Sequence, residues 1–333
     1  AGSSYGGDGG TVTVTNSGSI LTTGSYSHGM LLQSIGAGGG LMDIQGTNVA
    51  FGTPSAFGAS STVTANVNSS VGTQGYGSVG VLAQSIAGGG GLAVASNTIS
   101  FGASTNSGGY NAGNVDVNVN NPITTSGNAS PGVVAFSGGG GGGVAIVPSV
   151  NGLVVNTIHG NGNGGDVTVD VNQAITTHGS VSQGVIAASF GGGGGLLLGG
   201  DGDVSMQGVG NGDGGKVAVN IANGVSILTY GSNSTAVWTI SSNGKDDPEV
   251  NVGQGATVMG GRDGKGILLS GAINQVNNFG SIGTFDGVLG RAVESNGGTT
   301  TINNGGLITG TLALGGSGNI FNNQTGGVLN AVS

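Results

Sequence analysis

Carboxylates are the side chains of this 333-residue chain that could do chemistry, and there are only 14 of them. Enzymes that cleave polysaccharides use paired acids in a groove. Asp166 and Asp170 stand four residues apart, so a strand would place both on one face, and Asp116 lies 50 residues before Asp166. All five Lys and Arg residues follow residue 215, so no basic group accompanies these acids to bind an acidic sugar. We therefore interpret the acids as parts of solvated strand faces and predict that the protein is not an enzyme.

A short acidic segment resembles part of a calcium site. Residues 199–203 read Gly-Gly-Asp-Gly-Asp, similar to a fragment of the nonapeptide repeat whose carboxylates ligate Ca²⁺. Asp203 falls one position early, however, and no nine-residue repetition follows it. An Asp-Gly turn accounts for the same residues. We expect no cofactor and retain Asp201 and Asp203 as an incidental Ca²⁺ site.

The composition excludes several classes of protein. Glycine supplies 79 residues, charged residues make up only 6%, and Cys is absent. Gly, Ser, Thr and Asn disfavour helix interiors, and the glycines follow no every-third-residue rule, which excludes long helices and collagen. Residues 1–215 contain no Lys or Arg to neutralise phosphates, so we expect no nucleic acid partner. No run of about 18 apolar residues is present, so we expect no membrane insertion by this segment.

Four residue columns recur every 51 or 52 residues through the first 240 residues. They hold an aliphatic residue (Ile20, Val71, Ile123, Ile175, Ile227), Thr (Thr22, Thr73, Thr125, Thr177, Thr229), Gly (Gly24, Gly75, Gly127, Gly179, Gly231) and Ser (Ser34, Ser85, Ser137, Ser189, Ser241). Before each aliphatic residue, Val or Ile alternates with other, mostly polar residues, which predicts a strand with one buried face. A unit of this length cannot bury that face alone and must stack on its neighbours. The sequence therefore predicts an all-β chain folded as a β-solenoid.

The geometry expected of this solenoid decides how the columns are interpreted. We expect each unit to form about two coils of roughly 26 residues, so about thirteen coils ~4.8 Å apart would make a rod of ~60 Å. The Ser column is then a ladder rather than a set of nucleophiles, because no His is positioned beside it. The Thr column would recur every ~9.6 Å, too sparsely for an ice-binding array. His28, His159 and His178 share no column and predict no metal site.

The repeat register ends near residue 242, and we predict two regions. Residues 1–242 form a solenoid of four to five repeats, and residues 243–333 continue it with shorter coils that turn at Asn and Gly. Asn tolerates left-handed backbone and stacks in amide ladders, and it occurs in the pairs Asn277–Asn278, Asn303–Asn304 and Asn322–Asn323. Trp238 stands in the same column as Ile186, so we expect it to fill the core where the register changes.

A run of glycines recurs once per unit at the same place. Its central members are Gly38, Gly39, Gly40, Gly89, Gly90, Gly140, Gly141, Gly193 and Gly194, which we call the glycine stripe. One interpretation is a tight corner where backbone packs against backbone. The other is an assembly stripe that admits the backbone of a neighbouring rod or an extended partner. On the second interpretation, Val in place of Gly140 and Gly193 abolishes lateral assembly and leaves the monomer folded.

The units Ile123–Gly143 and Ile175–Gly195, with the pattern ITTxGxxSxGVxAxSxGGGGG, resemble the passenger regions of large bacterial autotransporters, the type V secreted proteins. The tail from Thr301 to Gly327 is similar to the coils that precede the translocator in such proteins. This resemblance implies a right-handed parallel β-helix on the outer surface of a Gram-negative bacterium. The outer-membrane β-barrel of that family is missing here, so we expect an excised or processed piece that is attached to such a barrel in the full protein.

These expectations combine into a prediction of function. We predict an extracellular, non-enzymatic adhesin or structural passenger that mediates adhesion, aggregation or biofilm formation. Its partner would be a host or neighbouring-cell surface, or a second copy of itself. A self-assembling filament or surface-layer subunit is the first alternative, because open solenoid ends expose unpaired strand edges. A polysaccharide-processing enzyme is the second.

Overall fold

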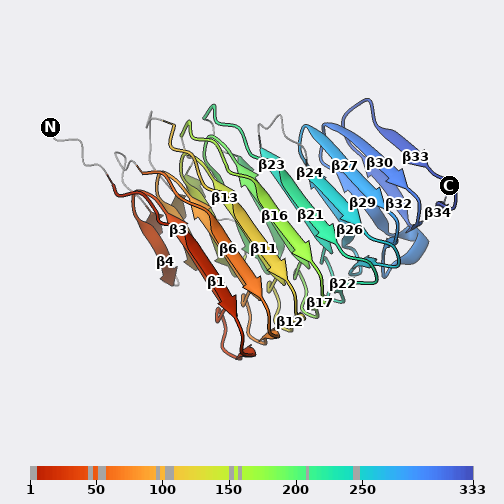
Figure 1. The fold of residues 1–333 in the computed structure, drawn as a ribbon, viewed down its shortest axis with the longest axis horizontal. Helices are drawn as coiled ribbons and strands as arrows, with labels where there is room; N and C mark the ends of the chain where they lie inside the picture. The colour runs from red at the N-terminus through yellow and green to blue at the C-terminus, as the bar shows by residue number, and fades with distance from the viewer. Residues whose placement is uncertain are drawn as a thin grey trace.

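A computed structural model describes residues 6–43, 48–51, 58–94, 98–101, 109–149, 154–156, 160–207, 210–242 and 248–332. Over these residues the chain is a right-handed parallel β-helix with a single 3-10 turn, η1 (Gly287–Leu289). Figure 1 shows the strands of successive coils side by side along a rod, with the two termini at opposite ends. The predicted fold class is confirmed.

Three sheets form the wall of the helix, and successive coils add one strand to each. Sheet A contains β1 (Val12–Asn16), β6 (Val63–Val67), β11 (Val115–Val119), β16 (Val167–Val171), β21 (Val217–Ile221), β24 (Pro248–Val252), β27 (Ile273–Asn278), β30 (Thr299–Asn304) and β33 (Ile320–Asn323). Sheet B contains β2 (Ile20–Thr22), β7 (Val71–Thr73), β12 (Ile123–Thr125), β17 (Ile175–Thr177), β22 (Ser226–Thr229), β25 (Thr257–Gly260), β28 (Ser281–Thr284), β31 (Leu307–Thr309) and β34 (Val328–Asn330). Sheet C contains β3 (Met30–Ile35), β8 (Val81–Ile86), β13 (Val133–Gly138), β18 (Val185–Phe190), β23 (Val237–Ser242), β26 (Lys265–Ser270), β29 (Arg291–Ser295) and β32 (Thr311–Leu314).

Each 51–52-residue unit forms one coil, so the expectation of two coils per unit is wrong. Val12 pairs with Val63 and Ile123 pairs with Ile175, which makes residues one unit apart direct neighbours. Sheet A has nine strands among the described residues, and at ~4.8 Å per coil the helix rises ~40 Å rather than ~60 Å. The second half of each unit also forms short strands, but they lie outside the helix wall.

These outer strands make a second layer. Sheet D contains β4 (Gly39–Asp43), β9 (Gly90–Val94), β14 (Gly142–Val147), β19 (Gly194–Gly199) and β20 (Gly202–Gln207), and sheet E contains β5 (Asn48–Phe51), β10 (Thr98–Phe101) and β15 (Val154–Asn156). The outward residues of sheet C, such as Val134 and Ile186, pack with Val144 and Leu196 of sheet D in one apolar core. From β8 to β23 sheet C is therefore buried on both faces, which explains why these strands are largely apolar.

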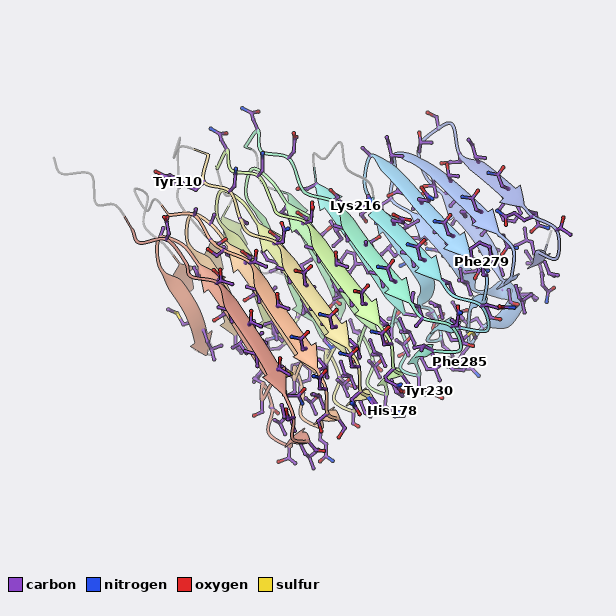
Figure 2. All side chains as sticks on the ribbon, viewed as in Figure 1. Tyr110, His178, Lys216, Tyr230, Phe279 and Phe285 are labelled. Carbon is purple, nitrogen blue, oxygen red and sulfur yellow. The ribbon has the colours of Figure 1, made fainter. Side chains whose placement is uncertain are left out.

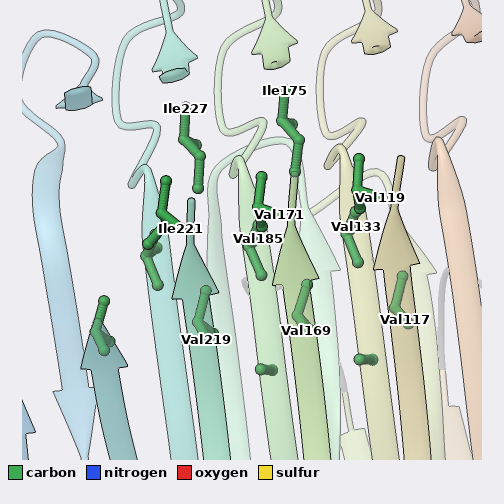
Figure 3. Close-up of a cluster of buried hydrophobic side chains, with 14 of the residues drawn as sticks. Val117, Val119, Val133, Val169, Val171, Ile175, Val185, Val219, Ile221 and Ile227 are labelled. Atoms are coloured by element: carbon green, nitrogen blue, oxygen red, sulfur yellow. The ribbon is translucent and has the colours of Figure 1, made fainter. Parts of the chain in front are cut away.

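A second apolar core fills the inside of the helix. Figure 3 shows its side chains stacked in columns along the rod, for example Val117, Val169 and Val219. Each column repeats Val, Ile or another aliphatic residue from coil to coil, so similar packing recurs along the axis. The core is thin, and hydrogen-bonded backbone ladders hold the coils together along its length.

The Ser column forms the predicted ladder inside the molecule. Ser137 Oγ donates to the carbonyl of Gly113, at 2.9 Å, and accepts the backbone N–H of Gly165, at 2.8 Å. Ser189 makes the same two bonds one coil later, to Gly165 and Gly215. Each serine thus fastens the segment that enters its own coil to the segment that enters the next.

The coils become shorter after Ser242. Val217 pairs with Pro248, 31 residues later. Beyond that point one coil takes 26 residues, as between Asn278 and Asn304, and the last takes 19, as between Asn304 and Asn323. The three asparagines form a predicted amide ladder, since Asn278 Nδ2 donates to Asn304 Oδ1 at 2.7 Å and Asn304 Nδ2 to Asn323 Oδ1 at 2.8 Å.

Candidate functional site

A groove opens where the second layer ends. Among the described strands, sheet D stops at β20, whereas sheet C continues with β26, β29 and β32. The groove has a volume of about 540 Å³ and adjoins a depression of about 560 Å³, with Ser205 and Asn296 common to both. Its polar lining includes Gln183, Asp203, Thr235, Lys265 and Glu294, and its floor includes Trp238. Small-molecule pockets are lined mostly by apolar side chains with a few convergent polar groups. This groove is instead mostly polar, and Val204, Trp238 and Leu268 are its large apolar members.

A tight hairpin positions β20 beside the groove. Gly200 and Asp201 form a two-residue turn between Gly199 and Gly202, and Gly202 has a φ of +148°, which favours glycine. β19 and β20 are antiparallel, whereas the other strand pairs of the described residues are parallel. This reversal ends the stacking of sheet D and leaves β20 as its edge strand.

Asp203 links the hairpin to the helix wall. Its Oδ2 accepts a hydrogen bond from Gln183 Nε2 at 2.9 Å, and its Oδ1 accepts one from the Gly199 N–H at 3.1 Å. Gln183 Oε1 in turn accepts the N–H of Thr235. Burial raises the pKa of Asp203 to about 7, although these two hydrogen bonds act to lower it. The carboxyl group therefore changes protonation state near neutral pH.

Trp238 lies at the floor of the groove. It pairs in register with Ile186, is 5% exposed, and belongs to the core between sheets C and D. Its Nε1 donates to Ser270 Oγ at 3.5 Å. The expectation that Trp238 fills the core where the register changes is confirmed, and the structure adds that the indole borders the groove.

Charged groups form the far wall of the groove. Glu294 pairs with two cations, Lys265 Nζ at 3.7 Å and Arg291 Nη1 at 2.6 Å. Asp201 and Asp263 are exposed at the rim, together with the partly buried Asp203. The lining thus has four carboxyl groups and one ammonium group, and attracts positive charge when Asp203 is ionised.

The structure separates the roles of the two calcium candidates. Asp201 occupies the predicted turn, and its Oδ2 accepts a hydrogen bond from Ser149 Oγ at 2.6 Å. Asp203 points to the other side of the hairpin, where both its oxygens accept N–H groups. No group of three or more His, Cys, Asp or Glu side chains able to hold a metal occurs among the described residues.

The acids singled out for catalysis lie on the outer face of sheet A rather than in the groove. Asp116 pairs with Thr168, and Asp170 pairs with Asn118 on the same two strands. Burial raises the pKa of Asp116, with smaller contributions from Asp170 and Asp166. Asp116 therefore lies near Asp166 and Asp170, as their spacing in the sequence permits.

Two of the histidines are described, and they occupy different environments. His28 is partly buried rather than in an exposed loop: its Nδ1 accepts the N–H of Val79, and burial lowers its pKa to about 4. His178 is exposed and stacks on Tyr230, with ring centroids 5.2 Å apart. His159 lies outside the described residues.

The Thr column lies at the ends of the sheet B strands, where Thr22 is partly buried and the later members are buried. Thr125 Oγ1 donates to the carbonyl of Ser130 at 2.6 Å, and the Ser130 hydroxyl donates to the carbonyl of Gly75 at 3.0 Å. Its spacing is one coil rather than two, so the sparse spacing expected for it is wrong. An ice-binding surface is excluded for this column because these hydroxyls are inside the molecule.

The glycine stripe is buried inside the molecule over most of its length. Gly89, Gly90, Gly140, Gly141, Gly193 and Gly194 are buried within the single chain, whereas Gly38, Gly39 and Gly40 at the first coil keep some exposure. A side chain at Gly140, whose φ is +75°, would meet the backbone of Gly160. The first interpretation, backbone packed against backbone, describes this region. The expectation that Val at Gly140 spares the monomer is wrong for the same reason.

Aromatic rings form a column on the surface. Figure 2 shows His178, Tyr230 and Phe285 following one another along the rod. Tyr230 and Phe285 stack with centroids 5.1 Å apart, and they are 48% and 39% exposed.

Several groove residues were not predicted from the sequence. Gln183 and Thr235 occupy one position of the repeat whose residue type varies from unit to unit, and Glu294 lies beyond the repeats, so no repeated residue type marks them. The signal that was present is the hairpin sequence at residues 199–203, which interrupts the repeat after the fourth glycine run. A turn at that point reverses the chain and ends the second layer.

Comparison of the chain with family models, curated proteins and solved structures gives no match. None of the helices in the described residues is long and apolar enough to span a membrane. Support for a function therefore comes from the geometry of the rod and its groove.

Proposed function

We propose that this protein is a non-enzymatic binding rod of the autotransporter-passenger type, displayed outside a Gram-negative cell and active in adhesion. The observation that carries the proposal is the groove at β20. There the regular surface of the β-helix is interrupted, and Trp238, Gln183 and Asp203 converge beside β20, the edge strand of sheet D among the described strands.

The architecture suits a protein that folds after export. Each coil pairs with the next coil of the chain, so folding can proceed one coil at a time without distant contacts. The chain has no Cys, so an oxidising compartment cannot trap it through a disulfide. Both features support the extracellular location that we propose.

The groove favours binding over catalysis. His28 and His178, which could act as bases, both lie outside its lining. Glu294 is held by two cations, and Asp203 accepts two N–H groups, so these two carboxyl groups are engaged in positioning the wall. Such fixed polar groups orient a ligand without attacking it.

Adhesion by protein-coated beads tests this proposal. Beads that carry the chain should attach to epithelial cells or to a second layer of bacteria, and Trp in place of Ser205 should reduce attachment because it fills the groove. Thr124→Trp is the matched control, since Thr124 is exposed on β12 away from the groove. Equal attachment by both variants and the unaltered chain would exclude the groove as the adhesive site.

A further inference from the structure

The edge of β20 that faces away from β19 is an unused strand edge. Among the described residues, β20 is the last strand of sheet D, and its six residues pair with β19 on one side only. An unpaired edge presents backbone N–H and C=O groups that can pair with another strand. This edge runs along the groove, whose lining includes Asp203, Val204 and Ser205.

The hairpin register decides which residues of β20 face the groove with their backbone. Gly199 and Gly202 close the two-residue turn, so they form a hydrogen-bonded pair, and bonding alternates along the two strands from there. Asp203 and Ser205 fall on the positions that do not hydrogen-bond with β19. Their backbone N–H and C=O groups therefore point away from β19, toward the groove.

The groove beside β20 lies over the next strands of sheet C. Trp238 of β23 lies beside Asp203, and the next strand of sheet C, β26, supplies Leu268 and Ser270 to the floor of the two depressions. A strand added to β20 would lie over β26, as the strands of sheet D lie over those of sheet C in the preceding coils. Its inward side chains would meet Leu268, while its backbone would pair with β20.

The charge of the groove selects among extended peptides. The lining holds the carboxyl groups of Asp201, Asp203, Asp263 and Glu294 but only one ammonium group, that of Lys265, which Glu294 engages. An incoming Lys or Arg side chain would find carboxyl groups on the β20 side of the groove. An incoming Asp or Glu would be repelled there.

We propose that the groove binds an extended peptide segment with basic side chains, which adds as a strand to the free edge of β20. The inference rests on the proposed binding function and names the class of partner. Strand addition obtains affinity from main-chain hydrogen bonds and selectivity from alternate side chains.

Fluorescence of Trp238 provides a direct test, because it is the sole Trp of the chain. The probe is an acetylated, amidated peptide Val-Lys-Val-Lys-Val-Thr, titrated to millimolar concentration. Two control peptides are Val-Glu-Val-Glu-Val-Thr and the first peptide N-methylated at each Val. We expect the first peptide to change the fluorescence saturably, and each control to bind at least about tenfold more weakly, since losing one or two hydrogen bonds costs that factor.

A variant of the protein gives the second arm. Pro in place of Ser205 removes an N–H that faces the groove, and edge strands tolerate Pro at such a position. Ser205→Pro should weaken binding of the Lys-containing peptide about tenfold. Val204→Thr, on the exposed face of β20, should leave this binding unchanged. The N-methylated peptide keeps the test valid if the Pro variant unfolds the hairpin.

Three outcomes overturn the proposal. They are no binding of the Lys peptide at millimolar concentration, equal binding of the N-methylated peptide, and quenching of Trp238 by maltohexaose but not by the peptide, which would assign the groove to a saccharide. If bead adhesion still depends on the groove in any of these cases, strand addition fails and the proposed function stands.

Discussion

At the scale of single residues, glycine is required where coils touch through backbone. A Cβ on Gly179 would overlap the carbonyl of Gly127, its neighbour in the preceding coil. The same contact recurs through the Gly24 column, which explains why the sequence repeats Gly there. The column was evident in the sequence, but its cause was not, because the contact partner lies one unit away.

We expect Gly179→Ala to lower the free energy of unfolding by about 1–3 kcal/mol, the usual cost of overpacking. Urea denaturation followed by circular dichroism measures the loss. Gly18→Ala is the control, because no atom lies within 4 Å of its added Cβ. A Gly179→Ala variant as stable as Gly18→Ala would contradict the packing described.

Asp203 makes the stability depend on pH in a defined direction. Its folded-state pKa of about 7 lies above the ordinary value of 3.8, so between these values the native state holds a proton that the unfolded chain has released. The contribution of Asp203 to stability is therefore fully present below about pH 4 and is lost as the pH rises to about 7.

We expect Asp203→Asn to remove this part of the pH dependence. The unfolding free energy of the unaltered chain should fall relative to that of the variant between about pH 4 and 7, and the difference should be level above that range. Urea midpoints measured across the range, with Asp213→Asn as the control, test this. Parallel curves for the unaltered chain and Asp203→Asn would show that the carboxyl group titrates normally.

At the scale of elements, side chains fasten one coil to the next in fixed positions. Ser189 satisfies the carbonyl of Gly165 and the N–H of Gly215 in a buried site. Ala at this position leaves both backbone groups without a partner, at a cost of about 1–3 kcal/mol. Thermal and urea unfolding should show this loss, whereas Ser180→Ala, at a partly exposed turn, should change stability by less than about 0.5 kcal/mol. Similar losses of stability in both variants would contradict a stabilising role for the two hydrogen bonds of Ser189.

A ladder on the outer face of sheet A has one defect. Asn118 Nδ2 donates to Asn66 Oδ1 at 2.9 Å, and Asn220 Nδ2 donates to Asp170 Oδ1 at 2.8 Å. Asp170 stands beside Asn118, but an ionised carboxyl group has no N–H to donate to it. Asp170 also repels Asp116, whose pKa it helps to raise.

We expect Asp170→Asn to stabilise the protein at neutral pH by about 0.5–1.5 kcal/mol, because it completes the ladder and removes the repulsion. Asp170→Ala removes the charge without adding a donor, so it separates the two contributions. Urea unfolding of both variants provides the measurement. An Asn variant no more stable than the Ala variant would show that the ladder adds nothing there.

The elements also show what the sequence could and could not predict. Alternating residues such as Val115, Val117 and Val119 located the strands of sheet A, because a buried face imposes a period of two. The number of coils per unit was not predictable, because a repeat of 51–52 residues does not say whether its second half joins the wall or covers it. The groove depends on the hairpin at Gly200, which occurs once, so no repetition revealed it.

At the scale of the whole molecule, the last described coil leaves part of the core uncovered. β33 and β34 each pair with one strand, Phe321 is partly buried against the inner core, and Leu329 of β34 is 38% exposed. Leu329 pairs in register with the buried Ile308, so its side chain faces the inside of the helix. At the other end of the rod, Val12 and Ile20 of the first coil are likewise only partly buried. In a solution of this chain alone, the first coil of one copy can therefore cover the last coil of another.

We therefore expect concentration-dependent, end-to-end association of the isolated chain, with particles that extend in steps of ~40 Å, the rise of nine coils. Leu329→Lys should abolish it, because a charge directed into an open end prevents strand stacking. Val328→Lys is the matched control, since Val328 lies next to it in β34 and pairs with the exposed Leu307 on the outer face. Sedimentation velocity and negative-stain microscopy measure the association. A chain that stays monomeric at all concentrations would exclude the filament alternative for this segment, and equal loss of association in both Lys variants would place the contact on the outer face instead.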